Sequence, residues 1–229
     1  MQDRLFDAIL FTRIPDEASS RGFLPRRQLP KLVNQRSVQE ELSYVEEQWG
    51  KDAHVGGTAS RSAKAIEDFA RIICGVRSAA FGGTSHKRRN KSFRRIFAIL
   101  VLMDRSSLIR AFVDEGVSDW DLPLARVPAI DNPAAFELRR KQALHTPLRC
   151  FGGWNHITIS TFDEWQWKMI APVFSRSAGR AISHYVLAPD VVLPFMPVEG
   201  GGVWRRGGFG RVSKTDIHAD HHNFGALEV

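Results

Sequence analysis

Apolar side chains recur every three or four residues in several stretches of this chain, which is the period of an amphipathic α-helix. A short first helix is predicted over residues 5–10, where four apolar side chains share one helical face. Glycine and proline then recur up to residue 36. Because these residues interrupt regular structure, residues 1–36 are predicted to form an irregular N-terminal segment that begins with that short helix.

A longer helix is predicted from Ser37 to Gly50. Ser37 and Glu40 form a capping-box pattern, in which a serine and a glutamate three residues later satisfy the free N–H groups of the first turn. Glycine directly after the last apolar residue is a common C-terminal stop. The apolar positions of this helix are Val38, Leu42, Val45 and Trp49.

Three further helices follow in the first half of the chain. The first starts near residues 58–60 and ends at Cys74, with an apolar stripe that includes Ile66, Ala70 and Ile73. The second, over residues 93–103, is apolar on every side, which is typical of a helix surrounded by protein, so it is predicted to be the core helix. After a break at 104–107, a third helix over 108–113 ends at Gly116.

The second half mixes several patterns. Residues 117–133 hold three prolines and are predicted to be an irregular crossing. A short helix is predicted over 134–143, because Asn132 suits a cap and Pro133 suits the first helical position.

A second capping-box pattern and a valine-rich stretch follow. Thr161 with Glu164 predicts a helix that begins there and continues through Val173. The valine-rich stretch 184–193 predicts a strand that ends at Pro194. No internal repeat is found.

Composition places the chain among folded proteins. It has 229 residues, of which 43% are hydrophobic and 25% charged, close to globular averages and far from the composition of disordered chains. The longest apolar run, residues 96–103, is much shorter than the ~20 residues of a membrane span, and the first residues lack a signal-peptide pattern. An intracellular protein, cytoplasmic or nuclear, with no membrane partner is therefore expected. Cys74 and Cys150 are predicted to be free and buried.

The net charge of +7 raises the question of nucleic-acid binding. The positive residues fall in four separate clusters, which is more typical of a solvated surface than of one binding stripe. The basic run 86–95 is interpreted first as a solvated loop and the first turn of the core helix. Because positive charge at the start of a helix opposes its dipole, a negatively charged partner of this run is the alternative. The clusters are Arg26–Arg27, residues 86–95, Arg139–Lys141 and Arg205–Arg206.

Histidine and tryptophan groupings were weighed as sites. His218, His221 and His222 suggest metal binding, but neighbouring histidines on an extended segment point in opposite directions, so a loop is the preferred interpretation. Trp165 and Trp167 lie two residues apart on a predicted helix and therefore face different sides. We expect one of them in the core and the other half-exposed.

The glycine-rich stretch near the C-terminus carries the clearest chemical pattern. Protein kinases cover the phosphates of ATP with a Gly-x-Gly-x-Phe-Gly-x-Val loop between two strands. Glycines there let backbone N–H groups approach phosphate oxygens. Arg205 occupies the first glycine position of the pattern. The candidate nucleotide-binding residues are Gly207, Gly208, Phe209, Gly210 and Val212.

A further set of segments carries a family resemblance: 94–105, 121–124, 148–151, 162–167, 193–195 and 207–224. Together they resemble filamentous-fungal proteins that carry a protein-kinase domain. The resemblance implies that residues 207–224 span the first two kinase strands and the turn after them, and that full-length members use ATP and Mg²⁺. In that family the phosphate-pairing lysine, its glutamate partner and the catalytic and magnesium-binding aspartates all follow such a loop. This chain is therefore expected to be truncated and inactive alone.

The patterns together predict a mainly α fold: a helical domain with a C-terminal strand and a glycine-rich, incomplete β-hairpin. The expected division is 1–36, an irregular segment; 37–198, a helical leader domain; and 199–229, a truncated kinase-like β-segment. The expected function is a regulatory or scaffolding leader of a kinase-like protein, partnered by proteins or by a kinase domain, with no cofactor or metal of its own. The alternative is a non-enzymatic basic module that binds nucleic acid or acidic partners.

Overall fold

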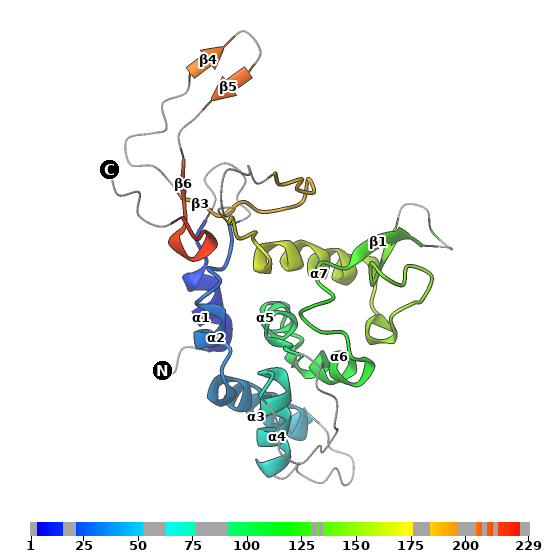
Figure 1. The fold of residues 1–229 in the computed structure, drawn as a ribbon. Coiled ribbons are helices and arrows are strands. Elements are labelled where there is room, and N and C mark those ends of the chain that lie inside the picture. The colour runs from blue at the N-terminus through cyan, green and yellow to red at the C-terminus, as the bar shows by residue number, and fades with distance from the viewer. Residues whose placement is uncertain are drawn as a thin grey trace, which may run out of the picture. The chain divides into compact units, whose positions relative to one another are not determined.

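The fold is known from a computed structural model, which describes residues 4–15, 22–52, 63–76, 91–129, 132, 135–175, 184–196, 205–207, 210–212 and 215–224 (Figure 1). Contacts divide the chain into two units. Unit 1 comprises residues 1–10 and 29–166, and unit 2 comprises residues 11–28 and 167–229. Residues 11–28 thus associate with the C-terminal part of the chain. The expected division into 1–36, 37–198 and 199–229 stays a prediction.

The predicted mainly α class is confirmed. In the described residues the helices are α1 (Leu5–Thr12), α2 (Leu29–Leu32), α3 (Gln35–Asp52), α4 (Ala63–Ile73), α5 (Arg94–Leu102), α6 (Ile109–Glu115) and α7 (His156–Met169). Short 3₁₀ turns are η1 (Ser106–Leu108), η2 (Arg149–Phe151) and η3 (Ala219–His221). The strands are β1 (Ala125–Pro128), β2 (Phe136–Arg139), β3 (Phe195–Met196), β4 (Arg205–Gly207), β5 (Gly210–Val212) and β6 (Asp216–Ile217). They form antiparallel pairs β1–β2, β3–β6 and β4–β5.

Helix α5 is the core helix of unit 1, as its pattern predicted. Every residue from Ile96 to Leu102 is buried. The following helix α6 ends at Gly116, whose φ of 70° is the left-handed conformation that glycine adopts without steric cost. Both predictions from the hydrophobic pattern are confirmed here.

An aromatic cluster extends this core toward α7. Phe112 of α6 is fully buried and stacks on Phe162 of α7, with ring centroids 5.6 Å apart. Phe151 and Trp154 meet both rings edge to face. Aromatic pairs in this geometry stabilise a core beyond the area they bury.

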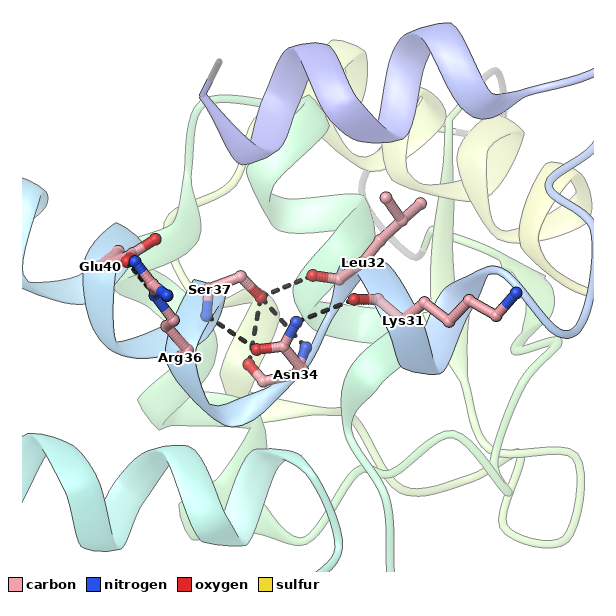
Figure 2. A network of polar contacts seen from close by, with 6 residues as sticks. All are labelled: Lys31, Leu32, Asn34, Arg36, Ser37 and Glu40. Atoms are coloured by element: carbon pink, nitrogen blue, oxygen red, sulfur yellow. Dashed lines mark hydrogen bonds and ion pairs between the residues drawn. The ribbon is translucent and has the colours of Figure 1, made fainter. Parts of the chain in front are cut away.

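The start of α3 lies two residues earlier than predicted, and Asn34 forms its cap (Figure 2). The Asn34 side-chain oxygen accepts from the Ser37 N–H at 3.1 Å, and Ser37 Oγ accepts from the Asn34 N–H at 3.0 Å. The capping box therefore joins Asn34 to Ser37, and the predicted pairing of Ser37 with Glu40 is wrong. Glu40 instead binds Arg36 at 2.8 Å, one turn apart. The helix also continues through Gly50.

The helix predicted over 134–143 is wrong, because β2 occupies residues 136–139. The side chains of Glu137 and Arg139 pair at 2.9 Å, while Leu138 between them is buried. Contacts between residues two apart follow the period of a strand. Strand β1, within the predicted irregular crossing, supplies the hydrogen-bonding partner, with Arg126 opposite Leu138. Sequence patterns within 134–143 do not reveal this partner.

Helix α7 begins five residues before the predicted Thr161 and ends at Met169, short of Val173. Asn155 caps it, since its side-chain oxygen accepts from the Thr158 N–H at 2.9 Å. Thr161 lies inside the helix, where its hydroxyl donates to the Ile157 carbonyl. The capping-box pattern at Thr161 therefore gave the wrong start.

The strand predicted over 184–193 is also wrong. Residues 184–188 are exposed and belong to none of the strand pairs formed by the described residues, and Val186 is 100% exposed. The strand lies just beyond, at β3, where Phe195 pairs with Ile217 and Met196 with Asp216. Valine content favours extended backbone, but a strand also needs a neighbouring strand.

Helix α4 keeps the C-terminal part of the predicted stripe, with Ala70 and Ile73 buried, whereas Ile66 is only partly buried. Its expected beginning at residues 58–60 lies outside the described residues. No helix among the described residues is long and apolar enough to cross a membrane.

Candidate functional site

The glycine-rich stretch forms a β-hairpin in unit 2 (Figure 1). Strands β4 and β5 pair antiparallel, with Arg205 opposite Val212 and Gly207 opposite Gly210. Gly208 and Phe209, which connect the strands, lie outside the described residues. Of the five predicted nucleotide-binding residues, Gly207, Gly210 and Val212 therefore lie on paired strands, and a binding role for the five stays a prediction.

The chain just after the hairpin joins β6, the turn η3 and the histidine group. In this segment His218 Nδ1 accepts from the Asp220 N–H at 3.1 Å, and His222 Nδ1 accepts from the Phe224 N–H at 3.2 Å. His222 also stacks on the Phe224 ring. Within the described part of the chain, no group of three or more His, Cys, Asp or Glu side chains is arranged to hold a metal ion.

His221 is the best-buried histidine of this group, with 1% of its surface exposed. Its Nε2 accepts from the Arg26 N–H at 3.1 Å. The neutral ring therefore carries its proton on Nδ1, which donates to the Pro172 carbonyl at 2.9 Å. Burial lowers the pKa of His221 below the ordinary 6.5 and outweighs the acceptor at Pro172, which favours the protonated ring.

Asp119 caps the core helix of unit 1 from a distant position in the sequence. Its Oδ1 accepts from the N–H groups of Arg95 at 2.9 Å and Ile96 at 3.2 Å. Its Oδ2 accepts from the Ser92 hydroxyl at 2.8 Å. Burial raises the pKa of Asp119 above 3.8, although these three donors favour the carboxylate. The basic start of α5 thus has a negatively charged neighbour within the chain.

Two other acidic side chains of unit 1 also hold structural contacts. Asp163, 2% exposed, accepts from Arg126 Nε at 2.7 Å and from the Gln166 side-chain amide at 2.7 Å. Glu115, at the end of α6, accepts from the N–H groups of Arg149 and Cys150 at 2.9 and 2.7 Å. Burial alone would raise the pKa of Glu115, but these hydrogen bonds lower it below 4.5.

Both cysteines are free and buried, as predicted. Burial raises the pKa of the Cys74 thiol, and burial together with the Glu115 carboxylate strongly raises the pKa of the Cys150 thiol. Neither thiol therefore has the lowered pKa that a reactive cysteine needs. Trp165 and Trp167 are both partly buried, so the expected contrast between a core and a half-exposed tryptophan is not seen.

Several members of the basic clusters bind carbonyl or carboxylate oxygens of the chain itself. Lys91 Nζ donates to the Gly116 carbonyl at 3.2 Å, and Arg94 Nε donates to the Val33 carbonyl at 3.0 Å. Arg139 pairs with Glu137, and Arg140 pairs with Asp121 at 3.1 Å. Residues 86–90 lie outside the described part. Binding of nucleic acid or an acidic partner stays a prediction.

No family model, curated protein or solved structure matches the chain. The resemblance to kinase-domain proteins accordingly stays a prediction from the segments quoted above. Sequence reasoning missed Asp119, Asp163 and Glu115, because the partners that join them to other elements lie 23 to 37 residues away. Asp163 also has a local partner in Gln166, three residues further along α7. The basic start of α5 was the one available signal, since it required a nearby negative charge.

Proposed function

We propose that this chain is a non-catalytic regulatory or scaffolding module of a kinase-like protein. The proposal rests on the hydrogen bonds that three acidic side chains of unit 1 accept. Asp119, Asp163 and Glu115 each bind backbone N–H groups or side-chain donors that hold elements together. Carboxylates engaged in this way stiffen a frame and are poorly placed to exchange protons with a substrate.

The hairpin β4–β5 supports the kinase-like part of the proposal. Two short strands pair antiparallel with Gly207 opposite Gly210, and an antiparallel strand pair also flanks the glycine-rich loop with which kinases cover phosphates. A two-stranded hairpin is marginally stable in water, so this segment is suited to completing a sheet with a kinase domain. In this proposal the hairpin is the segment that contacts the kinase domain.

Phosphotransfer assays test the catalytic half of this proposal. The purified chain is incubated with labelled ATP, Mg²⁺ and a general protein substrate, beside the Gly210→Pro variant, in which a backbone N–H of β5 is lost. We expect no transfer above the protein-free blank in either sample. Measurable transfer by the wild-type chain that disappears in Gly210→Pro would contradict the proposal.

Co-purification tests the scaffolding half. The tagged wild-type chain is isolated from its own cells beside Gly210→Pro and beside Asp114→Ala, a change of an exposed side chain on α6. We expect a polypeptide with a protein-kinase domain to co-purify with the wild type and Asp114→Ala, and to be depleted with Gly210→Pro. Equal recovery with all three chains, or no such polypeptide, would refute a kinase-linked scaffold.

A further inference from the structure

Three segments of unit 2 that are distant in sequence meet at the His221 ring. Residues 23–26 contribute the Arg26 N–H and the Phe23 ring, which meets His221 edge-on at 5.1 Å. Residues 172–174 contribute the Pro172 carbonyl. Residues 218–222 contain His221 itself, whose backbone carbonyl accepts from the Phe174 N–H at 2.8 Å. We call this arrangement the three-segment contact.

The contact requires a neutral ring with one particular tautomer. A proton on Nε2 would face the Arg26 N–H, so two donors would oppose each other where an acceptor is now required. The ring has 1% of its surface exposed, so water does not solvate the added charge in the folded state. Protonation of His221 therefore weakens the three-segment contact.

The charged groups around the ring do not change this result. His218 lies on the same segment with its ring 5.9 Å away, and its positive form would oppose a second positive charge. Asp220 would favour protonation, but its carboxylate already accepts from the Arg27 N–H at 3.3 Å and pairs with the Arg27 guanidinium at 3.6 Å. The segment 170–174 contributes carbonyls and no titratable side chain. Arg26 adds further positive charge on the remaining segment.

The position of the contact in the chain decides what its opening releases. Between the hairpin and His221, β6 pairs with β3, and the His218 N–H donates to the Pro194 carbonyl at 2.9 Å. Opening at His221 therefore releases residues 219–222 from residues 23–26 and 172–174, while β3 and β6 stay paired. We propose that protonation of His221 opens the three-segment contact and makes the attachment of residues 219–222 within unit 2 responsive to mild acid. This inference concerns the fold of unit 2 and holds whether or not the proposed function is correct.

The direction of the effect follows from linkage. Above pH 6.5 His221 is neutral both in the closed contact and when released, so the contact has its full stability. As the pH falls below 6.5, the released ring binds a proton and the closed ring resists it. Closure is therefore lost progressively, by up to about tenfold in the closing equilibrium per pH unit, until the pH reaches the lowered pKa of the closed state.

Long-range ¹H–¹⁵N NMR of the histidine rings in the whole chain tests the first step. We expect His221 at pH 7.5 as the Nδ1–H tautomer and a folded-state pKa below 6.5. A ring with its proton on Nε2, or a pKa of 6.5 or higher, would overturn the proposal. This measurement uses the wild-type chain, so it stands even where a variant fails to fold.

Hydrogen exchange tests the opening itself. Protection factors of the Arg26 and Phe174 amides, corrected for intrinsic rates, are measured from pH 7.5 to 5, with the Met103 amide at the end of α5 as an internal reference. We expect the protection factors of the Arg26 and Phe174 amides to fall as the pH is lowered, while that of the Met103 amide changes much less. His221→Gln, whose amide oxygen can accept from Arg26 but does not titrate, is expected to abolish the fall. His184→Gln, at an exposed histidine of the same unit, is expected to retain it. A fall that persists in His221→Gln, or none in the wild type, would refute the proposal.

Discussion

Replacing Asp119 by alanine removes the carboxylate that caps the core helix α5. Three donors then lose their acceptor: the N–H groups of Arg95 and Ile96, and the hydroxyl of Ser92. A buried donor left without a partner costs about 1–3 kcal/mol, while removing a buried charge returns part of that amount. We expect Asp119→Ala to lower the free energy of unfolding by about 3 kcal/mol.

Asp119→Asn separates the hydrogen bonds from the charge. The side-chain oxygen of asparagine still accepts from the helix N–H groups, so we expect a loss of about 1 kcal/mol. Asp114→Ala on α6 is the matched control, because its carboxylate pairs with Arg110 at 3.5 Å on an exposed surface. Exposed pairs of this kind contribute about 0–1 kcal/mol, so the control should change stability little.

Urea unfolding followed by far-ultraviolet circular dichroism measures these differences. With a slope of about 2 kcal/mol per molar urea, a 3 kcal/mol loss moves the midpoint down by about 1.5 M. The expected order of midpoints is wild type and Asp114→Ala, then Asp119→Asn, then Asp119→Ala. A midpoint for Asp119→Ala within 0.2 M of the control, as an order-of-magnitude limit, would show that the remote cap contributes nothing to stability.

Three other changes test the fold in the same assay. Asn34→Ala and Ser37→Ala should each cost about 1 kcal/mol, and the double variant should cost clearly less than the sum, since both remove one reciprocal cap. Phe112→Ala should cost about 3–5 kcal/mol because it empties the centre of the aromatic cluster, whereas Phe11→Ala, 81% exposed, should change the midpoint little. Glu115 has a lowered pKa, so its contribution is complete above pH 4.5 and is lost as the pH falls through the folded-state value. Glu115→Gln should therefore lose less stability than wild type between pH 5 and 3, and equal losses would contradict the assignment.

Strongly periodic helices were predictable because their own side chains decide them. The order of apolar residues in the sequence directly predicts the seven buried residues of α5 and the buried residues of α4. Gly116 likewise marks its helix end through its own backbone freedom. In each case the decisive interaction lies within one turn of the residue concerned.

Elements that depend on a distant partner were not predictable. Residues 136–139 become a strand because β1 lies beside them, whereas 184–193 belong to none of the strand pairs found among the described residues. The caps show the same division at shorter range. Asn34 and Asn155 cap α3 and α7, whereas the patterns at Ser37 and Thr161, three and six residues further on, suggested later starts.

The candidate site divides in the same way. Paired strands around the glycines could be anticipated from the motif, whereas the contacts of His221 and Asp119 join residues 195 and 23 to 27 positions apart. Patterns within a short stretch of sequence do not predict such pairs. The sequence did show positively charged residues at the start of α5, where the helix dipole disfavours them, and in the structure the Asp119 carboxylate lies at that helix end.

Pairing of β3 with β6 fixes the two ends of the intervening stretch beside each other, with Met196 opposite Asp216. The pairing of these two short strands therefore offsets the entropic cost of closing the stretch between them. Doubling the length of that stretch would raise the cost by only about 0.6 kcal/mol. Insertions, deletions and replacements within the stretch between β3 and β6 are consequently expected to leave the register of the two strands unchanged. In this respect the β3–β6 pair is a site of unit 2 that tolerates insertions.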